Sequence, residues 1–258
     1  MNTKNEYPEY FARFYDVIYS ATRQQADHDF FMKKILSAKG PVLEVGAGTG
    51  RLFVEALKKG ADIYGIDSSS HMLDVLKSKI KASDHHRVSV QNFTELYHDL
   101  KFDLIVAPFR MMSHLLTVED QQAAINKIYA HLNPWGTFIF DLYIPDPKLL
   151  ANGLDNVTDF DGEYAPGKKL KRITTSKSDI VSQLNDVSMK FIWDEDGKKK
   201  DETWNMQLRF YFRYEIEHLI ARSKLKMVGT YGSYDERPLD KNSRDFVVIC
   251  QKLGMLPR

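Results

Sequence analysis

The chain has 258 residues, of which 43% are hydrophobic and 28% are charged, and its formal net charge is +1. This length fits one sizeable domain, or one domain with an insertion, and the apolar fraction excludes collagen-like and disordered classes. The nearly neutral charge provides no long-range field to attract nucleic acid or an anionic membrane, so neither is an expected partner.

Features that bear on the compartment point to the cytoplasm. The single cysteine, Cys250, cannot form an internal disulfide, which is typical of a reducing compartment. The first residues, Met1–Glu6, lack the apolar stretch of a signal peptide, and no apolar run approaches the ~18 residues that cross a bilayer. We therefore expect a soluble cytoplasmic protein, and the sequence leaves a homodimer open.

The N-terminal segment, residues 1–38, is expected to be a helical cap. Its large apolar side chains recur at helical spacing between residues 7 and 36. The residues in this pattern are Phe11, Phe14, Tyr15, Ile18 and Tyr19. They predict one or two amphipathic helices that lie over the edge of a core.

Strand and helix patterns alternate over residues 39–147. Short apolar runs predict strands at 42–45, 63–66, 88–91, 103–107 and 137–143. Helical patterns lie between them over 52–57, 68–76 and 121–131, and the last helix is expected to stop at 133–136. Alternation of this kind builds a parallel sheet with helices on both faces. A helix over 214–225 and strands at 227–231 and 246–251 are expected to complete this core within 214–258.

Residues 148–213 interrupt the alternation with a period-two pattern. Every second residue from Trp204 to Phe212 is apolar, which predicts a strand with one buried face. A matching strand at 187–193 joins it through the turn 194–197, and a third strand is expected at 170–175. We expect this aromatic stripe to pack the insertion against the main sheet. Tyr211 and Arg213, on the polar face, are expected to look toward a substrate.

The loop after the first strand is the most informative segment. Its glycines, Gly46, Gly48 and Gly50, follow a G-x-G-x-G pattern, and Arg51 occupies the place of the third glycine of a dinucleotide-binding loop. Acidic residues flank it, with Glu44 before the loop and Asp67 at the end of the next strand. This arrangement resembles the class I methyltransferases that depend on S-adenosylmethionine (SAM).

Three features resemble, more narrowly, the small-molecule N-methyltransferases that dimethylate amino sugars in bacteria. They are the segment Tyr15–Tyr19, the segment Pro108–Leu115 after the fourth strand, and the antiparallel insertion. The resemblance implies an α/β fold with a Rossmann-like, mostly parallel seven-stranded sheet and helices on both faces. It also implies that the last strand is antiparallel and that the inserted β sheet is a lid over the substrate.

The resemblance also implies a set of residues that bind SAM. Gly46, Ala47, Gly48 and Gly50 would pass under its methionine part, Asp67, followed by Ser68, would accept hydrogen bonds from the ribose, and Glu44 would lie near the cationic end. The other candidates are Met72, Asn92 and Phe93 at the adenine, Pro108 and Phe109 at the transfer site, and Tyr15, Tyr19 and Arg23 at the methionine end. Asn92 departs from the acid usual there. Glu44 could instead brace the loop, and Asp67 could cap the next helix.

His114 and Tyr19 are the candidate catalytic residues. The resemblance places His114 beside the substrate amine, where a histidine near neutrality can accept a proton or orient a lone pair. The alternative is that His114 caps a helix or bonds within the lid. No metal site is expected, because His85 and His86 have no third ligand at metal-binding spacing.

The sequence therefore predicts a SAM-dependent methyltransferase that acts on a small molecule, with an amine favoured over a hydroxyl acceptor. Two alternatives stay open. One is a protein that binds SAM or S-adenosylhomocysteine without transferring a methyl group. The other is a methyltransferase that acts on protein or RNA.

Overall fold

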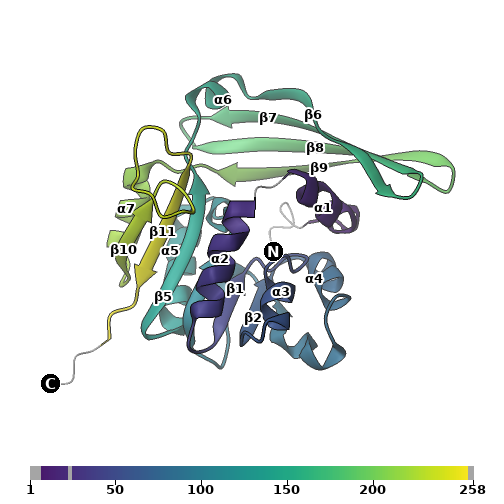
Figure 1. Ribbon diagram of the computed structural model, residues 1–258. Coiled ribbons are helices and arrows are strands. Elements are labelled where there is room, and N and C mark those ends of the chain that lie inside the picture. Colours follow the sequence, from purple (N-terminus) through teal and green to yellow (C-terminus); the bar gives the residue numbers. More distant parts are fainter. Residues whose placement is uncertain (1–6, 23–24, 255–258) are drawn as a thin grey trace.

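The computed structural model describes residues 7–22 and 25–254, which form two sheets (Figure 1). The larger sheet has seven strands in the order β10-β11-β5-β4-β1-β2-β3, and the smaller has four in the order β6-β7-β8-β9. The strands of the large sheet are β1 (Val42–Val45), β2 (Ile63–Asp67), β3 (Val88–Val90), β4 (Phe102–Ala107), β5 (Leu132–Tyr143), β10 (Lys226–Tyr231) and β11 (Asp245–Gln251). The predicted fold class is confirmed.

The large sheet is parallel except at β11. Strand β1 pairs in parallel with β2 and β4, and β4 pairs in parallel with β5. Strand β11 runs antiparallel to both β5 and β10. The carboxyl ends of β1, β2, β4 and β5 therefore meet at one edge, where ligands bind in open α/β sheets.

Helices cover both faces of this sheet. Successive residues of a strand point to opposite faces, so the apolar strands place apolar side chains on both faces, and each face packs against helices. Leu104 and Val106 face a core formed with α2 (Gln25–Ser37), α3 (Phe53–Lys58) and α4 (Ser70–Lys77). Ile105 and Ala107 face a core formed with α5 (Val118–His131) and α7 (Arg213–Ala221). Among the helices that the structure describes, none is both long and apolar enough to span a membrane.

Strand β5 begins five residues earlier than the sequence pattern predicted. The predicted stop at 133–136 lies inside the strand, next to an irregular register between β4 and β5. Trp135 adopts a left-handed conformation, and its backbone N–H donates to the Lys252 carbonyl at 2.8 Å. Turn-forming residues are tolerated there because they form a bulge at the end of the sheet.

The small sheet is an antiparallel meander. Its strands are β6 (Leu154–Ala165), β7 (Lys168–Asp179), β8 (Leu184–Glu195) and β9 (Lys198–Arg209), and the short helix α6 (Pro147–Asn152) precedes it. The predicted turn is confirmed at Asp196 and Gly197, which both have positive φ as a tight hairpin requires. Three strands were predicted, so β6 was missed, because this exposed edge strand has three register shifts and no clean alternation.

Helix α1 (Glu9–Thr22) lies between the small sheet and the rest of the molecule (Figure 1). Aromatic side chains of the small sheet pack on this helix and on Met72 of α4, so they do not pack directly on the large sheet as we had expected. The buried residues of this shared cluster are Phe11, Ala12, Phe14, Ile18, Met72, Leu170, Met189, Phe191, Trp193 and Trp204. The small sheet and α1 therefore form one apolar layer above the carboxyl edge.

The expected roles of Tyr211 and Arg213 are wrong. Strand β9 ends at Arg209, so the period-two pattern does not extend to these residues. Tyr211 is 2% exposed, and its hydroxyl lies 3.0 Å from the Met112 carbonyl oxygen and 3.2 Å from that of Leu115. Arg213 begins α7 and pairs with Glu217 at the surface. One side chain is structural and the other is solvated.

Phe191→Ala should destabilise the layer of α1 and the small sheet. The Phe191 ring is fully buried, with ring centroids 5.6 Å from Phe11 and 5.3 Å from Tyr10. Removing a buried phenyl ring costs about 3–5 kcal/mol of unfolding free energy because it leaves a cavity. Denaturant unfolding measures this loss. Val181→Ala, at a position 91% exposed, should change stability by less than about 0.5 kcal/mol, and an equal effect of the two changes would contradict the packing.

Candidate active site

The glycine loop at the carboxyl end of β1 depends on left-handed backbone. Gly46, Gly48 and Gly50 have φ values of 76°, 55° and 88°, which strain any residue with a Cβ atom. A Cβ atom at Gly46 would lie 2.3 Å from the Met111 sulfur, whereas one at Gly48 would lie 3.4 Å from its nearest neighbour, the Met72 methyl carbon. Gly48 therefore has room beside it that Gly46 lacks.

Asp67, at the end of β2, braces this loop. Its two carboxylate oxygens accept hydrogen bonds from the backbone N–H groups of Gly48 and Ser69, each at 2.9 Å. The side chain of Ser69, not that of Asp67, caps α4 by accepting from the Met72 N–H. Burial raises the pKa of Asp67, and hydrogen bonds from the backbone oppose the rise. The neighbouring Ser68 is exposed.

Glu44 is a buried acid with an unused acceptor. It is 1% exposed, and its Oε2 has no hydrogen-bond partner among the residues that the structure describes. Burial and the negative charge of Asp67 raise its pKa well above the usual range, while Arg51 lowers it. A buried carboxylate is costly unless a cation or a donor compensates it, so this position suits a cationic ligand.

Asp16 ties α1 to the glycine loop. Its carboxylate accepts a hydrogen bond from the Thr49 hydroxyl at 2.6 Å and pairs with Lys79. The Lys79 ammonium also donates to the Thr49 carbonyl at 2.7 Å. The N-terminal helix is thus fastened across the loop between Gly48 and Gly50.

The tyrosines of α1 face each other and the small sheet. The rings of Tyr15 and Tyr19 have centroids 4.3 Å apart. Arg172 of β7 lies with its guanidinium carbon 5.2 Å from the Tyr19 ring centroid and donates to the Tyr19 hydroxyl at 3.3 Å. Asp159 holds the same guanidinium through two hydrogen bonds. Arg23, a predicted contact of the cofactor, lies outside the residues that the structure describes.

The chain leaves β4 through two strained residues. After Pro108, both Phe109 and Arg110 adopt left-handed backbone, with φ values of 59° and 63°. Such conformations cost roughly 1–2 kcal/mol per non-glycine residue and persist at sites where the surroundings enforce them. The centroid of the Phe109 ring lies 4.6 Å from the guanidinium carbon of Arg51.

Asp141 of β5 is a residue that sequence reasoning missed. It is fully buried and accepts hydrogen bonds from the Tyr234 hydroxyl at 2.7 Å and the Arg110 N–H at 3.2 Å. Burial raises the pKa of Asp141, while the Arg110 guanidinium lowers it. The available signal was an acid inside the apolar run Phe138–Leu142. Asp141 fixes the strained turn after β4.

His114 ends the 3-10 helix η4 (Met111–His114), directly after this turn. Burial lowers the pKa of His114 to about 4, so the imidazole is neutral near pH 7. Its Nε2 lies 3.2 Å from the hydroxyl of Tyr7, a residue that precedes α1 and that no sequence pattern singled out.

The three adenine-side candidates have different surroundings. Asn92 is exposed, and its Oδ1 caps the 3-10 helix η3 (Phe93–Glu95) by accepting from the Thr94 N–H at 3.0 Å. Phe93 is buried in the core below. Met72 is 3% exposed and packs in the cluster of α1 and the small sheet. The structure thus gathers Glu44, Gly48, Asp67 and Met72, while Asn92 stands at the end of β3.

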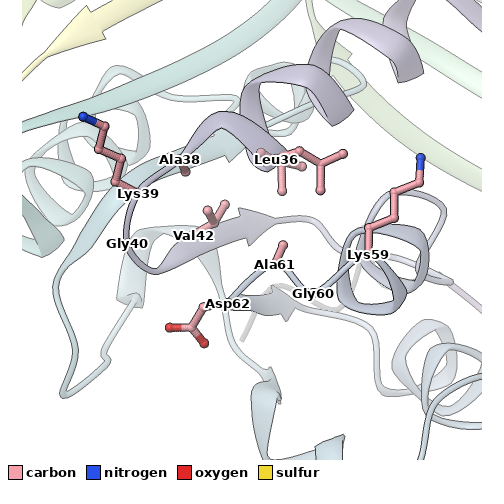
Figure 2. Close-up of a pocket in the computed structure, with 10 residues that line it drawn as sticks. Leu36, Ala38, Lys39, Gly40, Val42, Lys59, Gly60, Ala61 and Asp62 are labelled. Carbon is pink, nitrogen blue, oxygen red and sulfur yellow. The ribbon is translucent and has the colours of Figure 1, made fainter.

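One hollow and two histidines elsewhere in the structure lie away from this candidate site. A hollow of about 300 Å³ beside Gly40, Val42 and Asp62 lies at the amino ends of β1 and β2, opposite the carboxyl edge (Figure 2). Over residues 7–22 and 25–254, no group of three or more metal-binding side chains occurs. His85 and His86 instead contact the carbonyl oxygens of nearby residues.

Comparison with known proteins agrees with this geometry. Residues 42–136 match the model of a methyltransferase domain family. This match, together with the fold, supports a class I SAM-dependent methyltransferase. A putative methyltransferase of Geobacillus is 30% identical over 52% of this chain and 57% of its own length. A glycine/sarcosine N-methyltransferase of Halorhodospira halochloris is 28% identical over 92% of this chain and 85% of its own. The sugar N-methyltransferase KedS8 of Streptoalloteichus superposes with a TM-score of 0.71 at 15% identity, covering 91% of this chain and 92% of its own.

The charges of this methyltransferase suit SAM, its cofactor. SAM carries a sulfonium and an ammonium, and the unpartnered oxygen of Glu44 lies buried beside the loop that would receive them. Asp67 retains acceptor capacity for a ribose, because a carboxylate oxygen has two lone pairs and each uses one on the backbone. When bound, SAM supplies a methyl carbon that the sulfonium activates toward a nucleophile.

Asp67→Asn is expected to weaken SAM binding about tenfold. The substitution keeps one acceptor oxygen but replaces the other with an NH2 donor, so one charge-assisted hydrogen bond to the ribose is lost, worth roughly 1.5–3 kcal/mol. The hydrogen bond from one backbone N–H, of Gly48 or of Ser69, is lost with it. Isothermal titration with SAM measures the change. Asp62→Asn serves as the control, because Asp62 directly precedes the amino end of β2, and this variant should bind SAM normally. Equal affinities of both variants would remove Asp67 from the cofactor site.

Proposed function

We propose that this methyltransferase transfers the methyl group of SAM to the amine nitrogen of a small molecule. The observation that carries the proposal is a neutral, half-buried imidazole, that of His114, next to the strained exit of β4. The names of the relatives support it, because the Halorhodospira protein is a glycine/sarcosine N-methyltransferase and KedS8 is a sugar N-methyltransferase.

In this proposal, the protein aligns the acceptor and excludes water. Methyl transfer is a displacement, so orientation of the nucleophile and a dry site supply much of the rate. With a pKa of about 4, His114 holds a proton poorly near pH 7. It therefore acts by orienting the neutral amine through one hydrogen bond, and the ammonium that methyl transfer produces loses its proton to solvent once the product has left the site.

The small sheet acts as the lid of the site. Its last strand is fastened beside His114, because the Arg209 guanidinium donates to the Leu116 carbonyl at 2.9 Å. Its buried face packs on α1, which is itself tied to the glycine loop through Asp16. Closure over the acceptor and closure over the cofactor are therefore coupled through one helix.

The proposal also includes the class of methyl acceptor and the cell compartment. The formal charge of +1 gives the protein no strong attraction for nucleic acid, so a small molecule is the acceptor rather than RNA. We assign the protein to the cytoplasm, where its one cysteine, Cys250, stays buried and reduced.

An acceptor screen with matched pairs tests the proposal. Small amines and their hydroxyl analogues are incubated with the enzyme and SAM, and release of S-adenosylhomocysteine is measured. We expect turnover with one or more amines and none with the paired alcohols. Turnover only with alcohols would reject N-methylation, and turnover only with a protein or RNA extract would favour a macromolecular acceptor. Binding of SAM with no turnover at all would favour a binding protein.

A further inference from the structure

Tyr7 occupies a junction between the N-terminal helix, the small sheet and η4. Its ring centroid lies 4.8 Å from that of Phe11 in α1 and 4.6 Å from that of Trp204 in β9. Its hydroxyl lies 3.2 Å from Nε2 of His114, and the two rings meet edge to face at 6.0 Å. The Tyr7 hydroxyl thus reaches from this aromatic cluster to the candidate catalytic imidazole.

The backbone of Tyr7 is fastened to the cofactor side of the site. Its carbonyl oxygen accepts a hydrogen bond from the Ser69 hydroxyl at 3.1 Å. The N–H of the same Ser69 donates to Asp67 at 2.9 Å. Three hydrogen bonds, joined through the covalent structure of Ser69 and Tyr7, therefore connect Asp67 with His114.

The contact at Nε2 determines which nitrogen of His114 can form a hydrogen bond with the methyl-acceptor amine. A neutral imidazole has one N–H donor and one lone-pair acceptor, and the partner of one nitrogen fixes the role of the other. Since the Tyr7 hydroxyl takes Nε2, contact with an acceptor amine falls to Nδ1. If Nε2–H donates to the phenol oxygen, Nδ1 keeps its lone pair and can accept a hydrogen bond from the amine.

We infer that Tyr7 is a positioning residue that holds His114 in the Nε2–H form, so that Nδ1 accepts a hydrogen bond from the acceptor amine. This inference rests on the proposed N-methylation. Its structural part concerns only the histidine and the tyrosine, so it can be tested without an acceptor.

Nitrogen-15 NMR of the histidines tests the structural part. The protein is labelled at histidine, saturated with S-adenosylhomocysteine, and compared with Tyr7→Phe and Tyr10→Phe, while His114→Asn assigns the signal. Tyr10 is the matched control because it lies in the first turn of α1, three residues after Tyr7, and packs on Trp193 and Phe191. We expect wild type and Tyr10→Phe to have a single Nε2–H form and Tyr7→Phe to have a mixture. An Nδ1–H form in the wild type, or identical shifts in wild type and Tyr7→Phe, would overturn the inference.

Kinetics with an amine found in the screen tests the functional part. Loss of one neutral hydrogen bond predicts a three- to tenfold lower kcat for Tyr7→Phe, with KM for SAM unchanged. In the double variant with His114→Asn the two effects should not multiply, because both act through one imidazole. Multiplying effects, or an equal loss in Tyr10→Phe, would overturn the positioning role. Altered NMR shifts without turnover of any amine would reject the proposed function while leaving the contact of Tyr7 with His114 in place.

Discussion

Gly48→Ala is expected to weaken SAM binding by about 100-fold or more, which corresponds to about 2.7 kcal/mol. A Cβ atom at this position would lie 3.4 Å from the Met72 methyl carbon and 3.9 Å from the Gly46 carbonyl oxygen, which are ordinary contact distances, so the protein itself has space for it. The methyl group would project into the space where the loop meets its ligand. Isothermal titration with SAM measures the loss, and circular dichroism confirms that the variant folds.

Gly60→Ala provides a matched control for backbone strain. Gly60 follows α3 with a φ of 86°, and a Cβ atom there would meet nothing within 4 Å. Both substitutions therefore force alanine into left-handed backbone, at a cost of roughly 1–2 kcal/mol of stability. Only Gly48→Ala should lose affinity for SAM. Normal binding by Gly48→Ala would move the cofactor away from the glycine loop.

His114→Asn should lower kcat at least tenfold while the affinity for SAM stays unchanged. Asparagine is shorter and polar, so it removes the imidazole contact with the acceptor without adding an apolar surface. Correct orientation of a nucleophile accounts for large rate factors, and small misplacements lose them. Steady-state kinetics with an amine acceptor measures kcat, and titration with SAM measures affinity.

The pH dependence gives a second check on His114. Burial lowers its pKa from 6.5 to about 4, so the ring gains a proton only well below neutrality. The rate should therefore show no loss with a midpoint near 6.5 that belongs to this ring. The exposed His86 provides the control, and His86→Asn should keep normal turnover. Normal turnover of His114→Asn would leave His114 with a structural role as the partner of Tyr7.

The parts of the fold that follow local rules were predictable from the sequence. Alternating strands and helices, the loop at Gly46–Gly50 and the turn at Asp196 and Gly197 each depend on a few neighbouring residues. Strand β6 was not predictable, because its edge position and its bulges remove the alternation that marks a strand. The place of the aromatic stripe was also wrong, since period two shows which residues are buried but not what covers them.

In the candidate site, too, residues at the ends of strands were predictable, whereas residues brought together by long-range packing were not. Glu44, Gly48 and Asp67 lie at strand ends that any parallel sheet brings to one edge, so their neighbourhood was predictable. Tyr7 was missed because its contact with His114 spans 107 residues and depends on how α1 packs under the small sheet. Asp141 was missed because its partners, Arg110 and Tyr234, come from two distant loops.

Transfer of a labelled methyl group tests the central claim most directly. The enzyme is incubated with SAM that carries a deuterated methyl group and with the amines and alcohols of the screen. Mass spectrometry and NMR then locate the label. We predict that the label appears on the nitrogen of a small amine, with an equal amount of S-adenosylhomocysteine. Label on oxygen, or on protein or RNA alone, would contradict the account.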